Sequence, residues 1–236
     1  MLYVITQSGF IILTVVFYYL LLQEFKTALP NTTLPPDRQK RFLNRIIIAV
    51  AVWAVAVTAL SLLGVFGNFD IFPLNVGPFL LIPLLTIIIF TFSKTTREVL
   101  LHLHPSRIIR LQVFRVFVEI LLWLLFIQNL LPVQMSFEGR NVDILAGLTA
   151  PLIAYLTLQN KLSKTALIIW NIACLGLLIN IVSIAILSMP TPFRYFMNDP
   201  ANTIVTQFPF VFLPTFLVPL AYMLHFLSLR QLMIQK

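Results

Sequence analysis

The sequence predicts an all-α integral membrane protein with seven transmembrane helices, from its composition, its apolar runs and the placement of its charges. Of the 236 residues, 59% are apolar and only 10% are charged, a composition that excludes an ordinary soluble domain. Seven apolar runs approach the roughly 20 residues that a helix needs to cross the hydrocarbon of a bilayer. These runs lie at 3–23, 43–66, 76–93, 108–132, 142–160, 165–188 and 208–230. Because the connections between them are short, we expect one domain over 1–236.

The first four runs each have a distinct sequence feature. The run at 3–23 lacks a preceding basic segment and a following cleavage site, so we expect a retained helix and not a removed signal peptide. The second run follows a basic cluster and contains Trp53, and the third contains two prolines. The fourth run carries Arg115 and Glu119 within an otherwise apolar stretch, which makes it the most informative of the seven.

The last three runs differ in their small, polar and aromatic residues. The fifth contains small residues that let another backbone come close; they are Ala146, Gly147, Ala150, Pro151 and Ala154. The sixth contains the lone Cys174, which excludes an internal disulfide and a thiolate metal cluster. The aromatic-rich stretch 189–207 suits an interfacial helix or a cap over the bundle. The seventh has no lysine over 208–230, which excludes a retinal Schiff base there.

The distribution of basic residues predicts the orientation of the chain. Thirteen of the 16 lie after the first, third, fifth and seventh runs; these are Lys26, Arg38, Lys40, Arg41, Arg45, Lys94, Arg97, Arg107, Arg110, Lys161, Lys164, Arg230 and Lys236. On the other side, only Arg140 and Arg194 are basic. Because basic loops stay in the cytoplasm, we expect the N-terminus outside and the C-terminus in the cytoplasm.

This segregation also indicates the partners of the protein. A formal charge of +8 that lies at the membrane edge does not predict binding to nucleic acid. The lipid bilayer is the expected partner, and Arg38, Lys40 and Arg41 are candidates for holding anionic lipid at the cytoplasmic edge. We expect location in a bacterial inner membrane or a plasma membrane.

A repeated proline spacing suggests an internal duplication. Pro78 and Pro83 in the third run match Pro214 and Pro219 in the seventh. The halves of a parallel three-plus-one-plus-three repeat would be 1–94 and 142–236, with 108–132 as the linker helix. The alternative is chance similarity between apolar helices. In either case, each proline frees a backbone carbonyl and bends its helix, so we expect these four prolines to act as hinges.

Arg115 and Glu119 are the central pair of the predicted inner site. Their four-residue spacing places them on one helix face, where they can form an ion pair, and Gln112 extends the same polar stripe. The stripe must face other helices or water, because charge in hydrocarbon is costly. Two interpretations stay open: a neutralised pair that fixes helix packing, and a ligand site or proton relay.

Helix depth predicts which residues meet this stripe. At about 1.5 Å per residue, Asn171, Tyr222 and His225 fall near Arg115, in the cytoplasmic third of the bundle. Such a layer can bind an anion or a polar small molecule, with Arg115 as the charged anchor. It can equally be a packing layer, since Asn and His often bond across helices to avoid being unpaired.

The outer loops carry a second group of charged residues, which are Glu138, Arg140, Asp143, Arg194 and Asp199. They are candidates for an extracellular gate or outer site. The alternative is a structural plug, in which Arg140 and Arg194 form weak ion pairs with neighbouring acids in solvent.

No metal, cofactor or catalytic residue is predicted. His102 and His104 are two residues apart, which puts them on different faces of a helix. The sequence favours a small secondary transporter for a polar or anionic small molecule. The alternative is a non-transporting ligand sensor or accessory subunit that acts through a partner, and a membrane-embedded enzyme ranks third because no nucleophile or metal set accompanies Glu119 and His225.

Overall fold

The computed structural model describes residues 1–235, and within that part the chain forms helices and no strands; Lys236 lies outside the described residues. The α-helices are α1 (Leu2–Ala28), α2 (Pro36–Leu62), α3 (Gly77–Phe92), α4 (Lys94–Leu101), α5 (Pro105–Leu111), α6 (Phe114–Phe126), α7 (Ile144–Leu158), α8 (Lys164–Leu187) and α9 (Val218–Ile234). The shorter elements are η1 (Leu29–Asn31), η2 (Phe69–Ile71), η3 (Val133–Met135), η4 (Ile204–Thr206) and the π-helix η5 (Leu213–Leu217).

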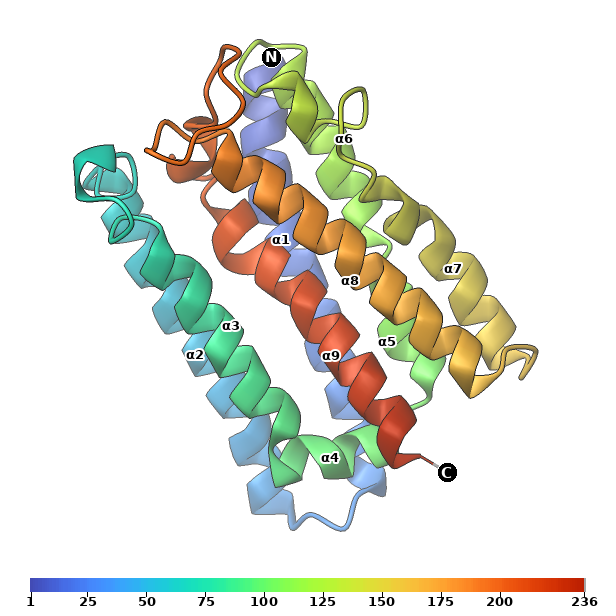
Figure 1. The fold of residues 1–236 in the computed structure, drawn as a ribbon. Coiled ribbons are helices and arrows are strands. Elements are labelled where there is room, and N and C mark those ends of the chain that lie inside the picture. The colour runs from blue at the N-terminus through green and yellow to red at the C-terminus, as the bar shows by residue number, and fades with distance from the viewer. Residues whose placement is uncertain (236) are drawn as a thin grey trace.

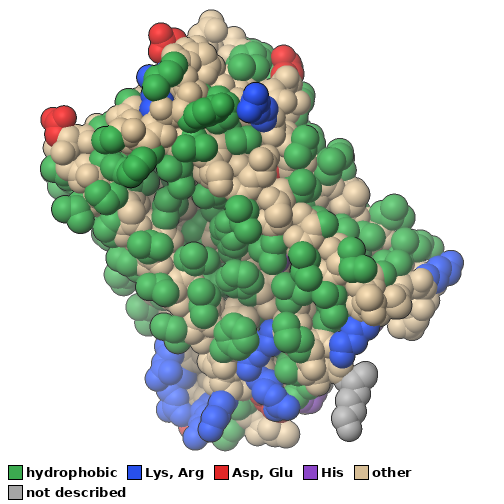
Figure 2. Space-filling model, in the orientation of Figure 1, with side chains coloured by type: hydrophobic (Ala, Val, Ile, Leu, Met, Phe, Trp, Pro, Cys, Tyr) green, Lys and Arg blue, Asp and Glu red, His purple; other side chains and the backbone are tan. Residues whose placement is uncertain are grey.

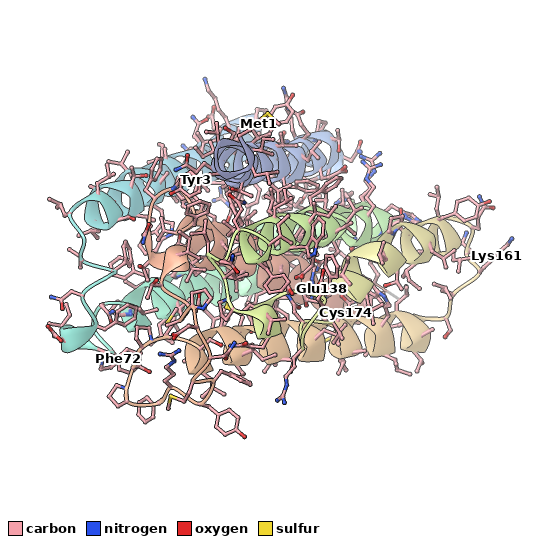
Figure 3. All side chains as sticks on the ribbon, turned by 90° about the horizontal axis from the view of Figure 1, so that it is seen from above. Met1, Tyr3, Phe72, Glu138, Lys161 and Cys174 are labelled. Carbon is pink, nitrogen blue, oxygen red and sulfur yellow. The ribbon has the colours of Figure 1, made fainter. Side chains whose placement is uncertain are left out.

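The long helices form one elongated bundle with the two termini at opposite ends (Figure 1). α9 lies in the middle, between α1 and α8 in the view from above (Figure 3), and it packs against α3, α5 and α8. In the most apolar part of the Leu213–Ile234 segment, 67% of the residues are buried. In the corresponding part of Pro36–Leu62, 11% are buried. The core of the bundle therefore surrounds α9, whereas α2 lies at its periphery.

Within residues 1–235, four helical segments are long and apolar enough to cross a membrane: Leu2–Asn31, Pro36–Leu62, Lys164–Leu187 and Leu213–Ile234. A fifth results if α3 and α4, which meet at a bend of 62°, count as one segment. Apolar side chains cover the middle of the molecule, and Lys and Arg gather at the end where the C-terminus lies (Figure 2). These features are compatible with a membrane protein.

We call the end that carries Lys26, Arg38, Lys94 and Arg107 the basic end. There, Glu24 of α1 accepts hydrogen bonds from Arg107 and Arg110, which joins α1 to the start of the α5–α6 segment. Glu98 of α4 accepts hydrogen bonds from the backbone N–H and the hydroxyl of Thr33, and these bonds lower the pKa of its carboxyl. The loop after α1 is thereby attached to α4, which lies across this end of the bundle (Figure 1).

The fourth predicted run, 108–132, is not one helix. It breaks at Gln112–Val113 into α5 and α6, and α6 ends at Phe126. The break is a short tighter turn, because the N–H groups of Arg115 and Val116 bond to carbonyls three residues back at 3.1 Å. The polar residues Gln112 and Arg115 therefore flank an irregularity in the backbone that periodicity did not reveal.

The segment before α7 descends into the bundle. α7 has only 15 residues and begins at Ile144, and at about 1.5 Å per residue it is about 22 Å long. In the preceding segment, Ser136, Asn141 and Asp143 are buried. The segment packs against α8 through η3.

The four predicted hinge prolines occupy different settings. Pro78 is in the first turn of α3, where a proline fits without bending the helix, whereas Pro83 is inside that helix. Pro214 is in the π-helix and Pro219 in the first turn of α9. Pro219 lacks the N–H that would bond Thr215 O in an α-helix, and Trp53 Nε1 donates to that oxygen at 3.1 Å. The structure therefore places a helix irregularity at Pro214 and Pro219, but not at Pro78.

Candidate functional site

Arg115 of α6 is the centre of a buried polar network that links four helices. Its side chain is 2% exposed. The Nε group donates to Asp143 Oδ2 at 2.7 Å, and a terminal nitrogen donates to Asp143 Oδ1, so the guanidinium binds the carboxylate with two bonds. The same nitrogen donates to the carbonyl of Cys174 in α8 at 3.3 Å. The other terminal nitrogen lies 3.0 Å from His225 Nε2 in α9.

The hydrogen bonds of His225 define its protonation state. A guanidinium is a donor only, so His225 Nε2 must accept from Arg115. The ring proton is then on Nδ1, which donates to Asn171 Oδ1 at 2.9 Å. Asn171 in turn donates to Ser228 Oγ at 3.1 Å. A doubly protonated ring would turn a hydrogen bond into a contact between two donors, so the network requires a neutral His225.

Glu119 forms the other branch of the network. The predicted ion pair between Arg115 and Glu119 is wrong, because Arg115 binds Asp143 instead. Asn141 connects the two branches: its amide donates to Glu119 Oε2 at 2.6 Å, and its Oδ1 accepts from the backbone N–H of Asp143 at 3.0 Å. The assignment of Asp143 to the outer loops is also wrong, since it is 4% exposed and lies at the level of Cys174 in the middle of α8.

A glycine explains how Asp143 reaches Arg115. A Cβ added to Gly147 would lie 2.7 Å from the backbone nitrogen of Val116 and 3.2 Å from Cβ of Arg115. Only a residue without a side chain lets α7 approach α6 so closely. Gly147 is one turn beyond Asp143, so this close approach places the start of α7 beside the guanidinium. The prediction that small residues in this helix permit close packing is confirmed.

A cavity of about 80 Å³ adjoins the network. Arg115, Glu119 and Asp143 are the charged residues on its wall, and the rest of the lining is apolar except for the backbone. Met135, Met189 and Val205, from the loops at the end opposite the basic end, also line it. The volume is enough for a few water molecules or one small solute.

The predicted outer residues divide into buried and exposed ones. Arg194 lies 3.6 Å from Asp199, which is the surface ion pair that the plug interpretation expects, and Asp199 is 93% exposed. Among residues 1–235, Arg140 does not pair with an acid but stacks over the ring of Phe196 at 5.3 Å. Glu138, labelled in Figure 3, accepts from Trp123 Nε1 at 2.6 Å. Of these contacts, Arg140 with Phe196 joins the two loops to each other, and Glu138 with Trp123 joins the first loop to α6.

The other predicted residues join the inner site in part. His225 and Asn171 are in the network, as the depth argument expected. Gln112 is buried and donates to the carbonyl of Ala221 at 3.3 Å, while its own side-chain oxygen is buried without a partner. Tyr222 is half-buried and packs against Phe226, with no hydrogen bond among the described residues.

Sequence reasoning missed Asn141, Ser228 and Glu24. Asn141 follows the charged residues Glu138 and Arg140, which favoured a surface position. Ser228 is a single serine in an apolar run, and such a residue gives little indication of a polar site. Glu24 could have been found as an acid near a cationic cluster at the end of the first run. In residues 1–235 no three potential metal ligands cluster; His102 and His104 are at the end of α4 and the start of α5.

Comparisons with known proteins give a family but no function. No curated protein and no solved structure matches the chain. A family model described as "Domain of unknown function (DUF8737)" matches residues 71–233, which is well over half of the chain and includes every residue of the polar network. The chain therefore belongs to the DUF8737 family.

Proposed function

We propose that the protein is a small secondary transporter that crosses the membrane seven times and moves a polar or anionic small molecule together with protons. The observation that carries the proposal is the network of Arg115, Asp143, Glu119 and His225, buried inside an apolar bundle around a small cavity. Charged groups at membrane depth are costly, and they mark substrate and proton pathways.

The proposed seven crossings consist of the four long spans and three further segments. α3 adds one, and residues 105–126 add another, since α5 and α6 together cover about 33 Å at about 1.5 Å per residue. α7 with the descending segment 133–143 makes the last. The basic end then faces the cytoplasm by the positive-inside rule, with the N-terminus outside, in an inner or plasma membrane.

Asp143 occupies the place that an anionic substrate would take. A guanidinium binds a substrate carboxylate or phosphate through the same two-bond geometry with which Arg115 binds Asp143. A small anion that enters the cavity competes with Asp143 for Arg115. Release of Asp143 frees the start of α7 from α6, which couples binding to helix movement.

Charge balance gives Glu119 its role. Arg115 neutralises Asp143, so Glu119 is the second carboxylate beside a single cation. A bound anion adds a further negative charge in a medium of low dielectric, and uptake of a proton compensates it. Glu119 lines the cavity and has one protein hydrogen-bond donor, Asn141, so it is the group that carries the coupling proton.

The helix irregularity around Pro214 and Pro219 is the proposed hinge. The π-helix lines the cavity through Leu213, Pro214 and Leu217, so a change there alters the cavity wall. π-bulges occur often at functional sites. The three-plus-one-plus-three repeat stays a prediction, although α3, which carries Pro78 and Pro83, does pack against η5 and α9, which carry Pro214 and Pro219.

The test replaces the buried ion pair by a neutral one. The double variant Arg115→Gln/Asp143→Asn removes both charges of the pair together, so neither member of the pair is left as an unpaired charge. In proteoliposomes we expect wild type to take up at least one labelled anion from a panel of formate, lactate, pyruvate and phosphate, and the double variant to take up none. The matched control is Arg194→Gln/Asp199→Asn at the exposed pair, which should retain uptake. Equal uptake by both double variants would contradict a substrate role for Arg115.

A specific observation favours the sensor alternative as a second candidate. Arg115 already has protein partners for its Nε and for both terminal nitrogens, and the cavity is small. A sensor would bind an anion without moving it. An anion that raises the melting temperature of wild type but not of Arg115→Gln/Asp143→Asn, with no flux in liposomes, would assign this function.

A further inference from the structure

A groove of about 500 Å³ lies between α1, α2, α3 and α9, apart from the polar network. Its volume is within the range of about 300–1,000 Å³ that is usual for small-molecule sites. Leu21, Phe25, Ile46, Val50 and Phe90 are among the apolar side chains that line it.

The groove exists because α2 packs loosely on the bundle. Only Phe42 and Val57 of its 27 residues are buried. Two polar contacts attach neighbouring residues across the groove: Trp53 Nε1 donates to Thr215 O, and Tyr18 OH donates to Phe216 O at 3.2 Å. Thr86 Oγ1 donates to its own helix. These donors are already used, so the interior of the groove presents apolar surface to an occupant.

The end of the groove that faces the basic end is different. Arg45 and Thr95 line it there, and neither side chain has a hydrogen-bond or ion-pair partner among residues 1–235. Arg38, Arg41 and Arg45 follow at spacings of three and four residues, so they share one face of α2. Like charges at this spacing repel each other, and an anion among them removes the repulsion.

We infer that this groove holds an acyl chain of an anionic phospholipid, with the lipid phosphate bound at Arg45. The apolar groove matches the acyl chain of such a lipid, and the unpaired guanidinium at one end of the groove matches its phosphate. The position agrees as well, because the basic end is where the headgroups of one leaflet lie if the bundle spans the membrane. The inference does not depend on the transport proposal, since it uses none of the network residues.

The test is native mass spectrometry of the full-length protein in detergent with added phosphatidylglycerol or phosphatidylcholine of identical chains. We expect tighter retention of phosphatidylglycerol, and a loss of about tenfold in that retention in Arg45→Gln, which is the effect of one hydrogen bond to a charged group. The matched control is Lys161→Gln, a basic residue between α7 and α8 that does not line the groove and lies away from α2 and α3 in Figure 3; this variant should bind lipid as wild type does.

A second pair of variants tests the acyl chain. Ala49→Phe fills the groove and should lower retention of both lipids, whereas Ala51→Phe, exposed on the same helix and outside the groove, should not. Equal binding of the two lipids, or equal losses in Arg45→Gln and Lys161→Gln, would overturn the inference. Full displacement of the lipid by inorganic phosphate would also overturn it, because the acyl chain would then contribute nothing.

Discussion

Arg115 shows how one residue is made compatible with an apolar bundle. Its charge is balanced by Asp143, and its remaining donors meet His225 and the Cys174 carbonyl. Removing one partner from a buried pair leaves an uncompensated charge, whereas removing both charges together does not. A comparison of single and double variants therefore tests whether Arg115 and Asp143 stabilise the protein as a pair.

Arg115→Gln and Asp143→Asn should each lower the free energy of unfolding by about 3–5 kcal/mol. The double variant Arg115→Gln/Asp143→Asn should lose much less than the sum of the two single changes, because neither partner of the pair is left buried without the other. Denaturation of the purified protein in mixed micelles measures all of these values. Additive losses would show that the two side chains do not depend on each other.

At the scale of elements, the contact between α6 and α7 positions the site. Gly147→Ala puts a methyl group against the backbone of Val116 and should cost about 1–3 kcal/mol of stability. It should also weaken the hold of Arg115 on Asp143. Gly176→Ala in α8 is the control: an added Cβ there meets nothing within 4 Å, and it should leave stability unchanged or raise it by up to about 1 kcal/mol. Melting temperatures in detergent compare the two, and equal effects would refute the close-packing explanation.

The elements also show what sequence can reveal. Hydropathy located the helices, with α3 predicted at 76–93 and found at Gly77–Phe92. It failed for 108–132, because a break of two residues leaves the apolar content of a run unchanged. Asp143 was assigned to the wrong place because a run boundary gives no sign that the preceding loop enters the bundle. His225 and Asn171 were found correctly, since regular helices make depth calculable.

At the scale of the whole molecule, the charge asymmetry makes topology testable. Cys174 is the one cysteine of the sequence, so a Cys174→Ala background provides a chain without competing thiols. Asp70→Cys and Asp199→Cys should react with an impermeant maleimide added to intact cells, whereas Lys40→Cys and Lys94→Cys should react only after lysis. The reverse pattern would invert the orientation, and a mixed pattern would contradict seven crossings.

The most direct test of the central claim, that Glu119 carries the coupling proton for transport, is proton flux in liposomes that contain a pH-sensitive dye. An anion that wild type transports should drive a change in internal pH with wild type and with Asp70→Asn, which alters an exposed carboxyl that does not line the cavity. With Glu119→Gln the pH change should fall to the level of protein-free liposomes. A pH change that persists undiminished in Glu119→Gln would contradict the account.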